Sequence, residues 1–157
     1  MRCYRIMSDA YHKNPYASSA SAGRWNPRGM RMIYAASSPS VAMLEYLCIK
    51  GNAVATRPWH MVVYEIGDET LVGTLEKRSL PADWNVLPHG KATQDFGKDW
   101  LVEREYPFLK VTSARIDIAF YPLEFNMLIN PDFPDLANLI TVVDSIPFTY
   151  LLDPSKG

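Results

Sequence analysis

The chain has 157 residues, 48% of them hydrophobic and 21% charged, with a formal net charge of −1. These values are typical of a soluble globular protein, so we expect a single domain over residues 1–157. A near-neutral chain lacks the strongly basic surface that favours direct nucleic-acid binding. No apolar run reaches the roughly 20 residues that span a bilayer, and the N-terminus lacks the apolar segment of a signal peptide. We therefore expect a cytoplasmic protein without membrane contact, in which Cys3 and Cys48 are reduced and buried.

The residue patterning predicts an α+β domain with many strands and two or three helices. Alternation over residues 3–7 indicates a strand with Arg5 on the opposite face from Tyr4 and Ile6. A polar loop over residues 8–23 leads to a second strand over residues 30–36. Further strands are predicted at residues 60–66, 111–118, 125–129, 139–143 and 148–152. A second helix is predicted at residues 95–105.

The first helix is predicted to begin after Ser38, because serine is a favoured N-cap and Pro39 suits the first helical position. Gly51 is a favourable end for this helix. Its core-facing stripe is expected to consist of Val41, Leu44, Leu47 and Cys48.

Glu45 falls beside this apolar stripe at 100° per residue, where a solvated carboxylate is unusual. Burying such a group without compensation costs about 1–3 kcal/mol. Glu45 therefore needs Arg5 or Arg24 as a structural partner, or it serves a functional site.

The sequence contains no familiar metal-binding or nucleotide-binding motif. His12, His60 and His89 show neither paired spacing nor an HExxH motif, so no metal site is expected. No Walker loop or GxGxxG motif follows a predicted strand. Cys48, Asn52 and His60 could form a nucleophilic set, but no spacing orders them and this alternative has little support.

Five other residues offer the chemistry that binds a pyrophosphate-linked nucleotide. Arginine forks suit phosphate oxygens, and a tyrosine ring stacks on a heteroaromatic group. A carboxylate stabilises a developing cation, and a hydroxyl can position that carboxylate or bind a ribose. The five residues are Arg5, Arg24, Tyr34, Glu45 and Ser113.

Most of these residues also have a purely structural interpretation. Arg24 could bond within its own turn, and Arg5 could be a solvated charge on an edge strand. Tyr34 could be a core aromatic residue, and Ser113 a small polar filler.

Several motifs resemble the RES domain, a family named after its Arg, Glu and Ser. Residues 23–35 read G-R-W-N-x-x-G-x-x-x-x-Y-A, and residues 38–45 read S-P-S-x-A-x-L-E. The resemblance continues through residues 80–84, 97–101 and 128–131, and so covers nearly the whole chain. The three letters fall on Arg24, Glu45 and Ser113. The chain departs from the family pattern at Thr112, Phe133 and residues 155–156, outside the five residues above.

The resemblance implies an ADP-ribosyltransferase-like fold, with a split β-sheet core and a few flanking helices. It implies a toxin that uses NAD as its substrate, without other cofactors, and cleaves the nicotinamide–ribose bond. The ADP-ribose acceptor could be water, inorganic phosphate, or a protein such as phosphoribosyl pyrophosphate synthetase. The partner would be an Xre-type DNA-binding antitoxin that blocks the NAD pocket, and family members commonly assemble as dimers with it.

The resemblance also suggests a role for each residue of the group. Glu45 would stabilise the ribosyl cation, Arg24 and Arg5 would hold the pyrophosphate, and Tyr34 would stack near the nicotinamide. Ser113 would orient Glu45 or bind the ribose. The alternative of an inactive nucleotide-binding or antitoxin-binding module is disfavoured, because Arg24, Tyr34, Glu45 and Ser113 are all present together.

Overall fold

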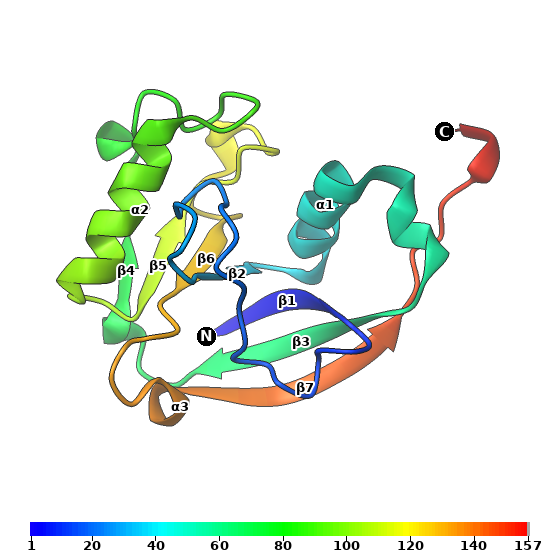
Figure 1. Cartoon of the computed structure of the whole chain (residues 1–157), viewed down its shortest axis with the longest axis horizontal. Coiled ribbons are helices and arrows are strands. Elements are labelled where there is room, and N and C mark those ends of the chain that lie inside the picture. The colour runs from blue at the N-terminus through cyan, green and yellow to red at the C-terminus, as the bar shows by residue number, and fades with distance from the viewer. Residues whose placement is uncertain (157) are drawn as a thin grey trace.

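The strands form one mixed sheet in the order β4-β5-β6-β2-β1-β3-β7 in a computed structural model that describes residues 1–156 (Figure 1). The strands are β1 (Arg2–Ser8), β2 (Ile33–Ala36), β3 (Trp59–Ile66), β4 (Val72–Thr74), β5 (Phe108–Val111), β6 (Asn126–Ile129) and β7 (Ile140–Phe148). The α-helices are α1 (Pro39–Lys50), α2 (Lys91–Glu103) and α3 (Leu136–Leu139). Short 3-10 helices are η1 (Gly51–Thr56), η2 (Glu69–Leu71), η3 (Lys77–Ser79), η4 (Ile118–Phe120) and η5 (Pro154–Lys156).

The sheet is split into two halves, β4-β5-β6-β2 and β1-β3-β7. Strands β1 and β2 join the halves through an antiparallel pairing of Tyr4 with Ala36. A core cluster on one face of the sheet combines Cys3 and Val62 from one half with Ile33 and Met127 from the other. The predicted α+β fold with a split sheet and a few flanking helices is therefore confirmed.

Helices α1 and α2 cover the face of the sheet opposite this cluster. Val41 of α1 packs with Ile6 and Met61, whereas Trp100 and Leu101 of α2 pack with Leu128. The register shows that these strand side chains share one face, because Tyr4 pairs with Ala36 and Tyr34 pairs with Leu128. The two helices therefore stand side by side on the sheet and leave a space between them. No helix in the described part of the chain is both long and apolar enough to cross a membrane.

Helix α1 begins and ends where the sequence predicted, but it faces differently. The Ser38 hydroxyl accepts a hydrogen bond from the Val41 N–H at 3.2 Å, and Gly51 ends the helix at a φ of 58°. The expected inward stripe is only half right, because Val41 is buried and Leu47 packs against the same core cluster, whereas Leu44 is 37% exposed and Cys48 is exposed. Apolar residues occur on every side of this helix, so periodicity alone could not select the buried side. The expectation that both cysteines are buried holds only for Cys3.

Two predicted strands are wrong, and both errors arise where the chain turns away from the sheet. Strand β5 ends at Val111, and the Ser113 hydroxyl accepts the Arg115 N–H at 3.0 Å, which closes a turn. The alternation of polar and apolar residues over residues 111–118 therefore does not mark a strand beyond Val111. Strand β7 ends at Phe148, so the predicted strand over residues 148–152 is absent from the described structure.

Helix α2 begins four residues before the predicted start at Asp95, at Lys91. The Asp83 carboxylate accepts hydrogen bonds from the N–H groups of Ala92 and Thr93 at 3.0 and 3.2 Å. This carboxylate satisfies N–H groups at the start of the helix, as an N-cap side chain would. The cap comes from a preceding loop, and a local N-cap pattern could not reveal it.

Candidate active site

The Gly–Arg–Trp–Asn turn is fixed by Tyr34, which lies on the neighbouring strand β2. The Gly23 N–H bonds to the Asn26 carbonyl at 3.0 Å. The Tyr34 hydroxyl accepts the Trp25 N–H at 3.0 Å and donates to Asn26 Oδ1 at 2.5 Å. These bonds leave the Arg24 side chain projecting from a rigid turn.

Helix α2 packs against the same turn. A Cβ at Gly97 would lie 1.6 Å from the Trp25 carbonyl oxygen, so a glycine is required for this close approach. Gln94 Nε2 donates to the Gly23 carbonyl at 3.0 Å. The Trp25 ring is 1% exposed and meets the Phe96 ring edge-on at 5.7 Å. The turn is therefore a rigid part of the core, with only one charged side chain.

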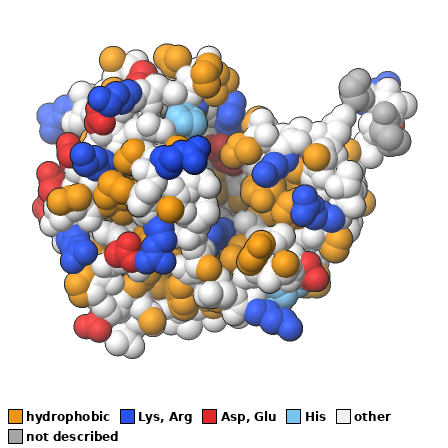
Figure 2. Space-filling model, viewed as in Figure 1, with side chains coloured by type: hydrophobic (Ala, Val, Ile, Leu, Met, Phe, Trp, Pro, Cys, Tyr) orange, Lys and Arg blue, Asp and Glu red, His pale blue; other side chains and the backbone are white. Residues whose placement is uncertain are grey.

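A pocket of about 670 Å³ lies between α1 and this turn, where Figure 2 shows the surface hollowed. Four of the five predicted residues line it: Arg5, Arg24, Tyr34 and Glu45. The fifth, Ser113, is 1% exposed and lies behind Glu45, to which its hydroxyl donates a hydrogen bond of 2.5 Å. The structure therefore brings together five residues that are spread from position 5 to position 113.

Glu45 is held by a hydrogen-bond network that compensates the partial burial of its carboxylate. Its Oε1 accepts from Ser113 Oγ and from Asn126 Nδ2, the latter at 2.7 Å. Its Oε2 lies 4.0 Å from Arg115 Nε, and the Glu45 side chain is 22% exposed. Of the two alternatives given for Glu45, structural pairing with Arg5 or Arg24 is not observed, and the ion pair is made with Arg115 instead. The carboxylate is thus fixed in position and remains accessible from the pocket.

Sequence reasoning missed Asn126 and Arg115. Asn126 begins an otherwise apolar strand, and the alternation of β6 places it on the same face as Leu128, beneath the helices. That polar residue at a core-facing position was a usable signal. Arg115 was assigned to a strand, and the turn at Ser113 redirects its side chain toward Glu45.

Arg24 does not bond within its own turn, as the structural alternative held, but bonds a different loop and lines the pocket. Its Nη1 donates to the carbonyl oxygens of Trp84 and Val86, both at 3.0 Å, whereas its other nitrogens make no hydrogen bond within residues 1–156. Burial lowers the pKa of Arg24, and the positive charge of Arg115 lowers it further. Both effects destabilise the guanidinium charge, whereas the carboxylates of Glu45 and Asp83 act in the opposite direction. An anion bound at the unoccupied nitrogens would compensate this cost.

Arg5 is not the solvated edge charge of the structural alternative. Strand β1 lies inside the sheet between β2 and β3, so its residues do not form an edge. Arg5 Nη1 donates to the Pro15 carbonyl at 3.0 Å, and the Tyr64 hydroxyl donates to the same oxygen. Arg5 lies on the opposite face from Tyr4 and Ile6, as predicted, and reaches the pocket beside the junction of the two halves.

Tyr34 combines the core role and the pocket role. Its hydroxyl is occupied by the turn, and burial raises its pKa well above the usual range, so the phenol stays neutral. Its ring lines the pocket and remains available for stacking.

The alternative nucleophilic set of Cys48, Asn52 and His60 is not assembled. His60 pairs in register with Met7, on the face of the sheet opposite α1, and its Nε2 lies 2.8 Å from Asp9 Oδ1. Cys48 belongs to α1 and is exposed. No chemistry that requires these residues together is supported.

Comparisons with known proteins agree with this arrangement. The family model described as the RES domain matches residues 2–151. A curated protein named Toxin Res from Yersinia enterocolitica is 30% identical over 98% of this chain and 98% of its own. The Prs ADP-ribosylating toxin of Sphingobium sp. is 31% identical over 84% of this chain and 83% of its own.

A solved structure shows the same fold. The M. tuberculosis MbcT–MbcA toxin–antitoxin complex contains a chain that matches 94% of this one, with a TM-score of 0.72 and 16% identity. The match covers 84% of that chain. The chain is therefore a member of the RES family, and the curated relatives named here are toxins.

Proposed function

We propose that the chain is a toxin that cleaves the nicotinamide–ribose bond of NAD. The observation that carries the proposal is the Glu45 carboxylate, which Ser113, Asn126 and Arg115 hold at the wall of a pocket that also presents Arg24. The pocket thus pairs a fixed negative charge with a separate positive region. NAD needs both, because it combines a ribose that becomes cationic with a pyrophosphate that is anionic.

In the proposed reaction the pyrophosphate lies against the unoccupied nitrogens of Arg24 and against the Arg5 side chain, and the nicotinamide stacks on Tyr34. The bond between C1′ of the ribose and the pyridinium nitrogen breaks, and its electron pair goes to that nitrogen. Nicotinamide leaves as a neutral molecule, and positive charge develops at C1′ and the ring oxygen. The Glu45 carboxylate stabilises this charge, because it is held in place before the charge appears.

The second step depends on the acceptor. Water or inorganic phosphate would attack C1′ through oxygen and lose a proton, giving ADP-ribose or its phosphate ester, with Glu45 polarising the attacking group. Transfer to a protein such as phosphoribosyl pyrophosphate synthetase is the second candidate, favoured by the relative named as a Prs ADP-ribosylating toxin. Both routes begin with cleavage of the nicotinamide–ribose bond of NAD beside Glu45.

We further propose an antitoxin partner of the Xre type, which would act in the cytoplasm by covering the NAD pocket. The toxin–antitoxin complex among the solved structures supports an antitoxin partner. The pocket has an apolar rim, since Ile49 of α1 and Leu87 of the opposite loop are 63% and 58% exposed. Such a rim suits a partner that closes over the opening.

The test follows the two products of NAD cleavage, the labelled ADP-ribose and the released nicotinamide. The wild-type chain is incubated with NAD carrying label in the adenylate half, with and without phosphate, and with purified phosphoribosyl pyrophosphate synthetase. Free ADP-ribose, its phosphate ester and a labelled protein band each identify one acceptor. Glu45→Gln keeps an oxygen for Ser113 and Asn126 but removes the charge, so nicotinamide release should fall at least ~100-fold. Intact NAD in every wild-type reaction, or full activity of Glu45→Gln, would overturn the proposal.

A further inference from the structure

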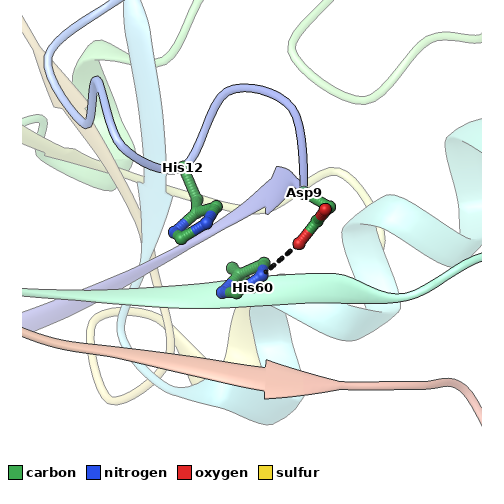
Figure 3. Close-up of side chains that lie close together, drawn as sticks. All are labelled: Asp9, His12 and His60. Carbon is green, nitrogen blue, oxygen red and sulfur yellow. Dashed lines mark hydrogen bonds and ion pairs between the residues drawn. The ribbon is translucent and has the colours of Figure 1, made fainter.

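Two of the three histidines of the chain meet face to face, although 47 residues separate them in sequence. The rings of His12 and His60 are stacked with their centroids 3.5 Å apart and their planes 2° apart. Figure 3 shows Asp9 and His12 reaching from the loop after β1 toward His60 on β3. One ligand atom from each of these three residues lies within 4.8 Å of the others. Their spacing along the chain gave no sign of this cluster.

The cluster is separate from the NAD pocket. His60 is paired in register with Met7, whose side chain belongs to the core cluster on the face opposite α1. Glu45 projects from α1, on the other face of the sheet. A ligand held by the three residues would therefore not block the pocket at Glu45.

Ser145 gives the cluster a common outer partner. Its hydroxyl oxygen lies 3.2 Å from His12 Nδ1 and 3.4 Å from His60 Nδ1. The serine comes from β7, where it pairs in register with Val62 of β3. Histidines that bind a metal through one nitrogen usually donate the other N–H to such a neighbour. Here both Nδ1 atoms converge on one oxygen, and His60 Nε2 faces the Asp9 carboxylate at 2.8 Å.

We propose that Asp9, His12 and His60 bind a divalent transition-metal ion, with Zn²⁺ as the preferred ion. Two imidazoles and one carboxylate form a three-residue ligand set that zinc accepts, with a fourth position for water. The Asp9 side chain is 72% exposed, so an ion can reach it from solvent. The His60 side chain is only 11% exposed, so packing holds this ligand in place.

Binding requires the His12 and Asp9 side chains to move, because the 2.8 Å between His60 Nε2 and Asp9 Oδ1 is too short for both atoms to bind one tetrahedral Zn²⁺. Imidazole nitrogens bind a metal in the plane of the ring, and the stacked rings direct their lone pairs in parallel. His12 therefore turns toward Asp9, away from the stack, while His60 stays on β3. His12 can move in this way because it is half-buried in a loop, between the exposed residues Tyr11 and Lys13.

The consequence would be a tether for the N-terminal loop. Residues 9–17 lie against the face of the sheet that carries His60 and Tyr64, and the chain continues into Ser18, Ser19 and residues 21–23, which line the NAD pocket. The same loop is already fastened by Arg5 at Pro15 and by the Tyr16 hydroxyl, which donates to the Ile140 carbonyl at 3.1 Å. A metal at Asp9, His12 and His60 would add a stronger fixation at its beginning. We infer a stabilising role, with no step of the NAD reaction routed through the ion.

The test is calorimetric titration of the chelator-treated full chain with ZnCl₂ at neutral pH, alongside thermal unfolding. We expect one Zn²⁺ per chain and an unfolding midpoint that rises with Zn²⁺ concentration. His12→Gln and Asp9→Asn should each abolish saturable binding, and Ser145→Ala should weaken it about 10–100-fold. His89→Gln is the matched control. It removes the remaining histidine, which lies at the NAD pocket, and this variant should bind Zn²⁺ normally.

Three results would overturn the proposal. Wild-type protein that binds no Zn²⁺ shows that the three residues are only a polar contact between loop and sheet. Unchanged binding by His12→Gln, with a native circular dichroism spectrum, places the ion elsewhere. Weak binding that is lost equally in His89→Gln indicates adventitious binding by surface histidines. Because the readouts are metal binding and unfolding, they do not depend on NAD cleavage.

Discussion

Asn126 and Ser113 donate hydrogen bonds to the same oxygen of the Glu45 carboxylate. They come from different segments of the sheet region, the start of β6 and the turn after β5, and they meet a helix residue from the first third of the chain. The second carboxylate oxygen is left to Arg115 and to the pocket. This division gives Glu45 one oxygen fixed by two hydrogen bonds and one oxygen that is left to the pocket.

Asn126→Ala should therefore slow nicotinamide release without abolishing it. The substitution removes one charge-assisted hydrogen bond, of about 1.5–3 kcal/mol, from a carboxylate that must hold its position. If about half of that stabilisation acts in the transition state, kcat falls about 4- to 13-fold. Steady-state kinetics on NAD measure the effect. Asn138→Ala, at an exposed position of α3, is the matched control, and equal kcat values for the two variants would contradict the role of Asn126.

Arg24→Lys should weaken substrate binding and loosen the loop at residues 84–89. A guanidinium can hold the Trp84 and Val86 carbonyls through Nη1 and still present its other nitrogens, whereas a single ammonium cannot meet both geometries. We expect KM for NAD to rise at least ~10-fold and limited proteolysis to cut this loop sooner. Arg28→Lys, at an exposed position two residues after this turn, should behave as wild type. An unchanged KM together with faster proteolysis would leave Arg24 a structural residue only.

Gly97→Ala should destabilise the fold, because the new Cβ would meet the Trp25 carbonyl oxygen at 1.6 Å. Overpacking of a core contact costs typically about 1–3 kcal/mol, and backbone atoms cannot move aside as a flexible side chain can. Urea unfolding measures the loss. Gly67→Ala adds the same methyl group where no atom lies within 4 Å and should change the free energy of unfolding little. Equal stability of the two variants would show that α2 does not press on the turn.

The two cysteines should differ in reactivity toward N-ethylmaleimide. Cys48 is exposed at the pocket, whereas burial raises the pKa of Cys3 to about 12, so Cys3 carries almost no reactive thiolate at neutral pH. Mass spectrometry should find one adduct on the native chain and two after denaturation. Cys48→Ser should show none in the native state. NAD should slow the modification in Glu45→Gln, which retains the binding residues, and rapid modification of native Cys3 would contradict its burial.

Local sequence signals determined much of the secondary structure of this protein. The Ser38–Pro39 start and the Gly51 end of α1 depend on backbone hydrogen bonds within a few residues, and so the sequence predicted them. Strands β1, β3 and β6 were also predicted, β1 from the alternation over residues 3–7. The setting of Glu45 among apolar residues indicated that it needed partners. The resemblance to the RES domain joined Arg24, Glu45 and Ser113 into one group.

Tertiary structure alone decided which atoms meet. The partners of Glu45 come from a turn and a strand about 70 to 80 residues away, and local pattern carries no information on such contacts. The same limit explains the error at residues 111–118, because the Ser113 hydroxyl ends the alternation by capping a turn that also serves Glu45. It explains the cluster of Asp9, His12 and His60 as well, since the pairing of β1 with β3 brings His60 next to Met7 and hence to the loop after β1. The amino-acid sequence supplies the chemical groups, and the pairing of the strands sets the distances between them.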